Sequence, residues 1–182
     1  MSAPPPENPA GVYQRHETFE QGVQSKLIGE IEQAPSRLRN TVDGLTDAQL
    51  DTAYRNWTVR QITHHLADSH LHSLIRFKWA LTESNPTIKA YEEADWVELP
   101  DSRSGQVGPA LAMLDGLHAK WVQLLNMMSE EQFSRTFFHP QSGETVDLWS
   151  ALNYYAWHGK HHTAQIQWLR QQHAWTSQEQ NS

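Results

Sequence analysis

Helical spacing of apolar residues is the feature that most limits how this chain can fold. Apolar side chains recur three and four positions apart in four stretches, and β-branched residues never alternate with polar ones as a strand requires. These stretches predict helices over residues 17–42, 58–82, 109–128 and 147–173. Residues 83–108 form a connection of roughly 26 residues, where about 2–8 is usual in a bundle. A crossover that lets the second and third helices run parallel explains this length, so we predict an all-α four-helix bundle with one long crossover.

Residues with known roles at helix ends mark several boundaries. Thr58 and Gln61 form a capping-box pattern at the start of the second helix. Asp147 is the expected N-cap of the fourth helix. Pro35 lies inside the first helix, where it should kink the helix or divide it into two abutting helices. Residues 46–51 are predicted to form one short helical turn.

Length and composition indicate a single domain. We expect it over residues 12–175 of the 182-residue chain, with a flexible Pro-rich arm at 1–11 and a flexible tail at 176–182. The chain has no cysteine, which excludes disulfides, cysteine-ligated zinc and a thiol nucleophile. Its net charge of −7 argues against a nucleic-acid partner, and no apolar run is long enough to span a membrane. Because residues 1–11 lack the pattern of a secretory signal, we expect a cytoplasmic location.

Histidines are abundant and clustered. Of the eleven present, seven lie in two short windows: His64, His65, His70 and His72 in one, and His158, His161 and His162 in the other. His158 and His162 are four residues apart on the fourth helix, so one metal ion can bridge their imidazoles. The pair His158 and His161, three apart, is an alternative that would place the metal nearer the face of Tyr154 and Trp157. Apolar periodicity favours His158 and His162 only modestly.

The second helix contributes one more inward-facing histidine. His65 lies beside the inward apolar stripe of this helix, whereas His64 falls on the opposite side and His72 lies two turns further on. Three inward imidazoles from two helices can therefore converge on one ion. Three neutral histidines with an open fourth position are typical of a catalytic zinc site rather than a structural one. Zn²⁺ is favoured, and Ni²⁺ or Co²⁺ would suit the same ligands.

Two alternatives stay open for this cluster. Buried histidines that bond Tyr154, Tyr155 or Asp68 would need no metal. Asp68, Glu144 or Asp147 could instead supply a fourth ligand and close the site, although no spacing compels this. The sequence assigns no general base.

Other chemically capable side chains are interpreted as structural or exposed. Five tryptophans could line a substrate pocket, although aromatic residues at helical spacing more often belong to the core: Trp57, Trp96, Trp121, Trp149 and Trp157. Arg60 and Arg76 on the second helix are expected to face solvent, and His139 is expected in a loop without a catalytic role. The chain has no G-x-S-x-G elbow and no Gly-rich phosphate loop, so neither serine-hydrolase nor nucleotide chemistry is predicted.

Five sequence blocks occur in an order that matches a known family. They are WTVRQITHHLADS at 57–69, FKWALTESNPTIK at 77–89, LDGLHAKW at 114–121, FHP at 138–140 and YAWHGKHH at 155–162. Over about residues 10–172 the chain thereby resembles the DinB-like superfamily and, within it, the YfiT branch of metal-dependent hydrolases. The resemblance implies a four-helix bundle, a cytoplasmic location and a homodimer. It also implies one divalent metal ion per subunit, held by His65, His158 and His162.

The residues and the resemblance together predict an enzyme. In the leading interpretation, a divalent metal held by three histidines, zinc or nickel, activates water for attack on a small-molecule substrate. An alternative from the same superfamily is a metal-dependent S-transferase for a low-molecular-weight thiol of the bacillithiol type, which needs the same ligands. A third is a metal-stabilised binding module without turnover. Residues 83–108 should pack on the bundle through Trp96, Val97 and Leu99, and either act near the pocket or serve as a spacer.

Overall fold

Four long helices form the body of the molecule, as the computed structural model of residues 4–175 shows; residues 1–3 and the predicted tail at 176–182 lie outside the described part of the chain. The helices are α1 (Gln21–Val42), α3 (Val59–Thr82), α6 (Val107–Met127) and α8 (Leu148–Gln172). Helix α1 packs against α6 and α8, and α3 packs against the same two helices. The predicted four-helix bundle is confirmed. Among the described residues, no helix is long and apolar enough to cross a membrane.

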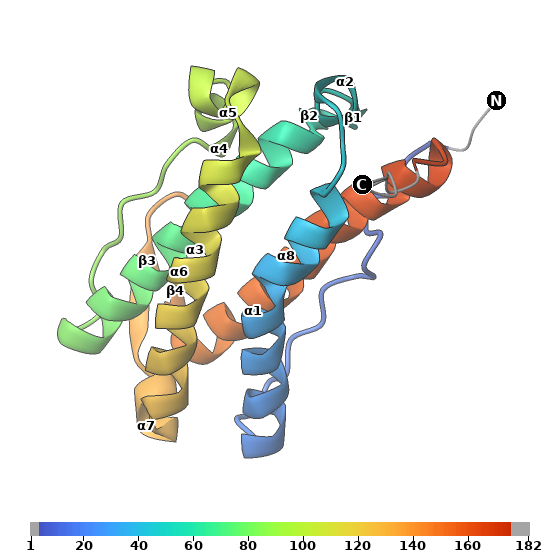
Figure 1. The fold of residues 1–182 in the computed structure, drawn as a ribbon. Coiled ribbons are helices and arrows are strands. Elements are labelled where there is room, and N and C mark those ends of the chain that lie inside the picture. The colour runs from blue at the N-terminus through green and yellow to red at the C-terminus, as the bar shows by residue number, and fades with distance from the viewer. Residues whose placement is uncertain (1–3, 176–182) are drawn as a thin grey trace.

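The long crossover has the predicted topology. Helices α3 and α6 run in the same direction, and α1 and α8 run in the opposite one (Figure 1). The connection between α3 and α6 contains two short helices, α4 (Glu93–Trp96) and α5 (Pro100–Ser104). It is anchored on α3, because Val97 is buried and its carbonyl accepts a hydrogen bond from Gln61 Nε2 at 3.0 Å. Leu99, expected as an anchor, is 50% exposed.

Capping residues define the helix ends as the sequence predicts. Thr58 caps α3 in a complete capping box with Gln61. Asp147 caps α8, and its carboxylate accepts a hydrogen bond from Ser150 N at 2.6 Å. The short turn predicted at 46–51 is helix α2 (Asp47–Leu50).

Pro35 lies within one continuous helix, so the prediction of two abutting helices is wrong. A proline has no N–H for the carbonyl four residues earlier, which here belongs to Ile31. His118 Nδ1, from α6, lies 2.6 Å from that oxygen and donates to it in place of the missing N–H. A partner from another helix thus compensates for the bond that Pro35 cannot make, and α1 continues through it.

Two short antiparallel hairpins accompany the bundle and were not predicted. They are β1 (Ala53–Tyr54) with β2 (Trp57–Thr58), and β3 (Thr136–His139) with β4 (Glu144–Asp147). Their strands are too short to show a period of two in the sequence. Each turn contains a left-handed residue, Arg55 at φ 56° and Gly143 at φ 70°. Helix α7 (Glu130–Phe133) precedes the second hairpin.

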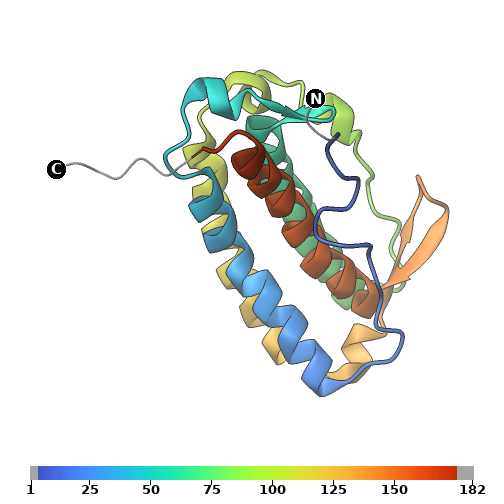
Figure 2. The same ribbon diagram turned by 90° about the vertical axis from the view of Figure 1, so that its right-hand side faces the viewer.

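The segment before α1 lies along α8 (Figure 2). Trp157 Nε1 donates to the Gly11 carbonyl at 2.9 Å, and Trp149 Nε1 donates to the His16 carbonyl at 2.7 Å. Tyr13 packs edge-on against Tyr154, with ring centroids 5.7 Å apart. This segment therefore covers one side of α8, while the predicted flexibility of residues 1–11 stays a prediction.

Candidate metal centre

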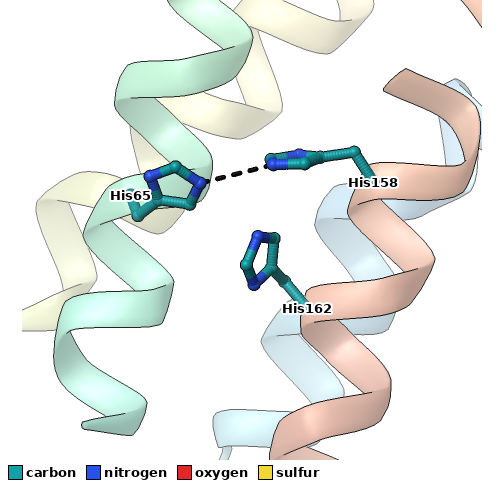
Figure 3. Close-up of side chains that lie close together, drawn as sticks. All are labelled: His65, His158 and His162. Atoms are coloured by element: carbon teal, nitrogen blue, oxygen red, sulfur yellow. Dashed lines mark hydrogen bonds between the residues drawn. The ribbon is translucent and has the colours of Figure 1, made fainter. Parts of the chain in front are cut away.

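Three histidines from two helices meet inside the bundle. His65 comes from α3, and His158 and His162 come from successive turns of α8; all three are buried (Figure 3). One ring nitrogen from each lies within 4.8 Å of the others, and the Nε2 atoms of His65 and His158 are 3.3 Å apart. Among the described residues, this is the one group of histidines and carboxylates close enough to hold a metal ion. The structure thus brings the three predicted residues together, while their role as metal ligands stays a prediction.

His161 does not join this group. Its ring stacks on Trp157 at a centroid distance of 4.6 Å and accepts a hydrogen bond from Gln165 Nε2 at 3.0 Å. The other end of the Gln165 amide, Oε1, lies 2.8 Å from His162 Nδ1 and accepts a hydrogen bond from it. His162 is thereby left with a free lone pair on Nε2, the nitrogen on the opposite side of the ring.

A second pair of buried histidines lies directly behind His158. His70 Nε2, from α3, lies 3.3 Å from His158 Nδ1, and His70 Nδ1 lies 2.8 Å from His118 Nε2 on α6. Gly159 lies beside this contact, where a Cβ would lie at an ordinary van der Waals distance of 3.4 Å from His70 Cε1. His118 ends the chain of rings at the Ile31 carbonyl. In the sequence, His70 belongs to a histidine cluster but has no predicted partner, and no pattern singles out His118.

Burial keeps these imidazoles neutral. It lowers the pKa of His65, His70 and His158 well below 6.5, and neighbouring histidines lower it further. Burial also lowers the pKa of His162 to about 4, although its hydrogen bond to Gln165 opposes the shift. Neutral rings have the lone pair that a metal ion needs.

No carboxylate of the described residues is part of the histidine cluster. Asp68 is not within reach of it, and burial raises the pKa of Asp68 to about 6. Asp147 caps α8, and Glu144 lies in β4. None of the hydrogen bonds of His65, His158 or His162 goes to Tyr154, Tyr155 or Asp68. The alternative in which those groups satisfy the buried histidines is therefore wrong for the cluster.

A cavity of about 710 Å³ opens beside His158. Small-molecule sites commonly measure about 300–1,000 Å³. The segment before α1, helices α3 and α8, and the second hairpin all contribute to its wall, which includes Tyr13, Ser69, Arg76, His139, Tyr155 and His158. None of the five tryptophans considered as pocket residues lines it. Trp57 instead packs on the cluster, with its ring centroid 4.6 Å from that of His65.

Both arginines of α3 are buried, so the prediction that they face solvent is wrong. Arg60 is 2% exposed, and its guanidinium donates hydrogen bonds to Asp51 at 2.8 Å and to Asp47 at 2.9 Å. Arg76 is 9% exposed and points to the cavity, where its Nη1 donates to Tyr155 Oη at 3.0 Å. Helical position alone did not reveal that Arg60 bonds the Gly105 carbonyl of the crossover at 2.8 Å, or that Arg76 shares a cavity wall with the second hairpin.

Comparison with known proteins supports the resemblance. The family model of the DinB superfamily matches residues 30–166. A Bacillus subtilis (strain 168) protein named "Putative metal-dependent hydrolase YfiT" is 44% identical over 170 residues, covering 92% of this chain and 96% of its own. Proteins from Bacillus mycoides (strain KBAB4) and from a strain of Bacillus cereus, each named as a "Putative metal-dependent hydrolase", are 48% and 53% identical, covering 92% and 81% of this chain and 96% and 86% of their own.

A solved structure agrees with these matches. The structure described as "YfiT from Bacillus subtilis is a probable metal-dependent hydrolase with an unusual four-helix bundle topology" superposes with a TM-score of 0.90. It is 43% identical in sequence, and the match covers 93% of this chain and 98% of that one. Fold, sequence and the order of the helices therefore agree, and this chain belongs to the DinB superfamily.

Proposed function

We propose that this chain is a metal-dependent enzyme that hydrolyses a small molecule, with one divalent ion per subunit held by His65, His158 and His162. The observation that carries the proposal is the convergence of these three buried, neutral imidazoles beside a cavity large enough for a small substrate. The relatives named as metal-dependent hydrolases support the reaction class.

The donor set fits a borderline divalent ion. Three imidazole nitrogens within 4.8 Å of one another match the His₃ arrangement of catalytic zinc sites, which leave a further position open. His162 already engages its Nδ1 with Gln165, so its Nε2 is free to bind. We propose Zn²⁺ as the resident ion and Ni²⁺ as the alternative, because imidazole ligands suit both.

The ion would supply Lewis-acid chemistry, lowering the pKa of a bound water to about 7 and polarising the substrate. The chain's own residues hold and orient the reactants. Trp57 covers the cluster on one side, and the cavity admits substrate beside His158. Burial raises the pKa of Tyr155, against the opposing effect of Arg76, so its hydroxyl stays protonated and can donate a hydrogen bond to substrate.

Elemental analysis combined with an activity screen tests this proposal. We expect about one Zn²⁺ or Ni²⁺ per chain in the purified protein, and hydrolysis of esters or amides that chelation abolishes and added metal restores. Protein without bound metal, or hydrolysis that survives chelation, would contradict it. Transfer of a thiol to an electrophile, with no hydrolysis, would instead support the S-transferase. Metal that raises Tm without any turnover would support a binding module.

We also propose that the protein is a cytoplasmic homodimer. The family resemblance supports both statements, and the chain has more aromatic residues than one small core needs. Light scattering in dilute solution should give twice the chain mass of 20.9 kDa, about 42 kDa. A mass of one chain would contradict the dimer, and recovery of the native protein outside the cytoplasmic fraction would contradict the location.

A further inference from the structure

Arg76 is a buried cation without an anion. Its side chain is 9% exposed, and Tyr155 Oη is its one hydrogen-bond acceptor among the described residues. Its Nε has no partner, and no carboxylate of the described chain lies within ion-pair distance of it. Arg60, equally buried on the same helix, has two aspartates. Burying an unpaired charge is costly. The two aspartates offset that cost for Arg60, whereas no anion in the described chain does so for Arg76.

Arg76 lies one side chain away from the histidine cluster. Its guanidinium is 3.0 Å from the Tyr155 hydroxyl, and the Tyr155 ring is 5.9 Å from the His158 ring between centroids. Arg76, Tyr155 and His158 all line the 710 Å³ cavity. A ligand in this cavity can therefore contact the guanidinium with one end and approach the cluster with the other.

We propose that Arg76 binds a carboxylate of the substrate, so that the substrates are small carboxylic acids carrying a hydrolysable group. This inference rests on the proposed function. A guanidinium offers parallel N–H donors that match the two oxygens of a carboxylate. Tyr155 engages Nη1, whereas Nε is buried and has no hydrogen-bond partner.

The charge of the cavity favours a carboxylate over a dianionic phosphate. Its wall contains two cations, Arg15 and Arg76, and three acids, Glu93, Glu144 and Asp147. Arg15 already pairs with Asp147 at 3.5 Å. Glu93 also lines this wall, but no ion pair joins it to Arg76 in the described chain. Arg76 is therefore the one wall cation free to bind an anion, and a single negative charge matches it better than two.

Binding of benzoate and benzamide to the metal-free protein tests the assignment without any catalysis. We expect calorimetry to show benzoate binding about tenfold more tightly than its neutral amide. Benzoate should also shift the side-chain N–H resonance of Arg76 Nε, and benzamide should not. Equal affinities, no benzoate binding, or an unmoved Arg76 resonance in the wild-type protein would overturn the proposal.

Matched variants locate the effect. Arg76→Gln should weaken benzoate binding about tenfold or more. Arg15→Gln removes the same charge from the same wall, but from an arginine that is already paired, and should change benzoate affinity by less than about twofold. Equal losses in both variants would overturn the proposal. Metal content of Arg76→Gln should stay at the wild-type level, so failure of metal binding and failure of carboxylate binding are separate results.

A second inference comes from the histidines behind the cluster. The Ile31 carbonyl can only accept, so His118 holds its proton on Nδ1 and its Nε2 is an acceptor. His70 must then donate from Nδ1 to His118, which leaves His70 Nε2 as an acceptor. His158 must in turn donate from Nδ1 to His70, which leaves its Nε2 lone pair facing the cluster.

We propose that His70 and His118 are positioning residues that hold His158 in the tautomer able to bind metal through Nε2. This inference also rests on the proposed function. The direction of these hydrogen bonds is set at the Ile31 carbonyl. Pro35 leaves this oxygen without an N–H partner, and it accepts a hydrogen bond from His118 instead. Hydrogen bonds to the far nitrogen of a ligating histidine are a common way to fix its ring and tautomer.

Nitrogen-15 spectra of the metal-free protein test the tautomer directly. We expect His158 to carry its proton on Nδ1 and His70 on Nδ1. In addition, His70→Phe, which keeps an aromatic ring but no acceptor, should weaken Zn²⁺ binding about 10- to 100-fold in chelator competition. His118→Gln, whose amide can both donate to Ile31 and accept from His70, should stay within about threefold of wild type.

Two results would overturn this second inference. One is a wild-type His158 protonated on Nε2, which the spectra report even if His70→Phe fails to fold. The other is a folded His70→Phe protein with wild-type Zn²⁺ affinity. Absence of metal binding in the wild-type protein would contradict the proposed function instead, while the spectra would still decide the tautomer.

Discussion

The two groups of buried histidines in this bundle differ in where their hydrogen bonds end. His70 and His118 form a chain that ends on the Ile31 carbonyl, so every ring nitrogen of this pair has a partner. In the cluster of His65, His158 and His162, nitrogen atoms instead approach one another without a carbonyl or carboxylate between them. A buried histidine group therefore becomes a candidate cation site where ring nitrogens of three histidines converge, and not simply where histidines are dense.

Replacing a histidine of the cluster should have the largest effect, and the effect should be on the amount of bound metal. We expect His65→Ala, His158→Ala or His162→Ala each to lower bound metal well below one ion per chain, because two imidazoles hold a divalent ion far less tightly than three. Mass spectrometry of the purified variants measures it. Wild-type metal content in any of the three would contradict the ligand assignment.

Neighbouring histidines provide the controls. His161→Ala should retain metal, because that ring bonds Gln165 and stacks on Trp157 outside the cluster. His64→Ala should retain it as well, since His64 lies outside the group whose ring nitrogens converge. Loss of metal in these controls together with the cluster variants would indicate general destabilisation rather than loss of ligands.

Much of the fold was accessible from local patterns. The capping residues Thr58 and Asp147 fixed two helix starts, and the length of residues 83–108 indicated the parallel pair α3 and α6. The continuity of α1 through Pro35 was not accessible. It depends on His118, which comes from another helix and compensates the Ile31 carbonyl. A helix break is a local expectation, whereas its repair is a tertiary contact.

The candidate site divides in the same way. Spacing of four residues and an inward face favoured His158 and His162 only modestly, and the family resemblance completed the cluster with His65. The partner of His70 and the burial of Arg76 were not predictable, because both are set by elements distant in sequence. Arg76 is buried by a cavity wall that includes the second hairpin, whose strands were too short to recognise.

His118 should also make the stability of the fold depend on pH. Burial lowers the pKa of His118 to about 4, although the Ile31 carbonyl and Asp115 oppose this shift and Arg37 reinforces it. In the unfolded chain His118 takes up a proton near pH 6.5, so the unfolded state binds more protons between pH 6.5 and 4. The free energy of unfolding should therefore fall as the pH decreases through this window, by about 3 kcal/mol from His118 alone.

Denaturant unfolding at several pH values tests this prediction. His118→Gln cannot titrate but keeps both hydrogen bonds, so its stability should depend on pH less steeply than that of the wild type, by up to about one proton. An unchanged slope would show that His118 is protonated in both states or in neither. The same variant should keep wild-type metal content, because its amide preserves both hydrogen bonds of His118.

The smallest expected effect concerns Trp96 of the crossover, which packs on His72, a histidine that belongs to neither group. The two rings lie at a centroid distance of 5.2 Å, and Trp96 contacts Tyr91 at 4.7 Å. Helix α4, which ends at Trp96, also carries Glu93 of the cavity wall. Trp96→Ala should loosen that wall and weaken benzoate binding about two- to fivefold, the loss expected from one or two aromatic contacts.

Metal content should stay unchanged in Trp96→Ala, because Trp96 contacts no histidine of the cluster. Leu99→Ala is the matched control, since Leu99 lies in the same crossover but is 50% exposed, and its removal should leave benzoate affinity as in the wild type. If Trp96→Ala also binds benzoate as the wild type does, residues 83–108 act only as a spacer between two parallel helices. If it loses metal instead, the crossover supports the cluster itself, and His72 is coupled to the converging histidines.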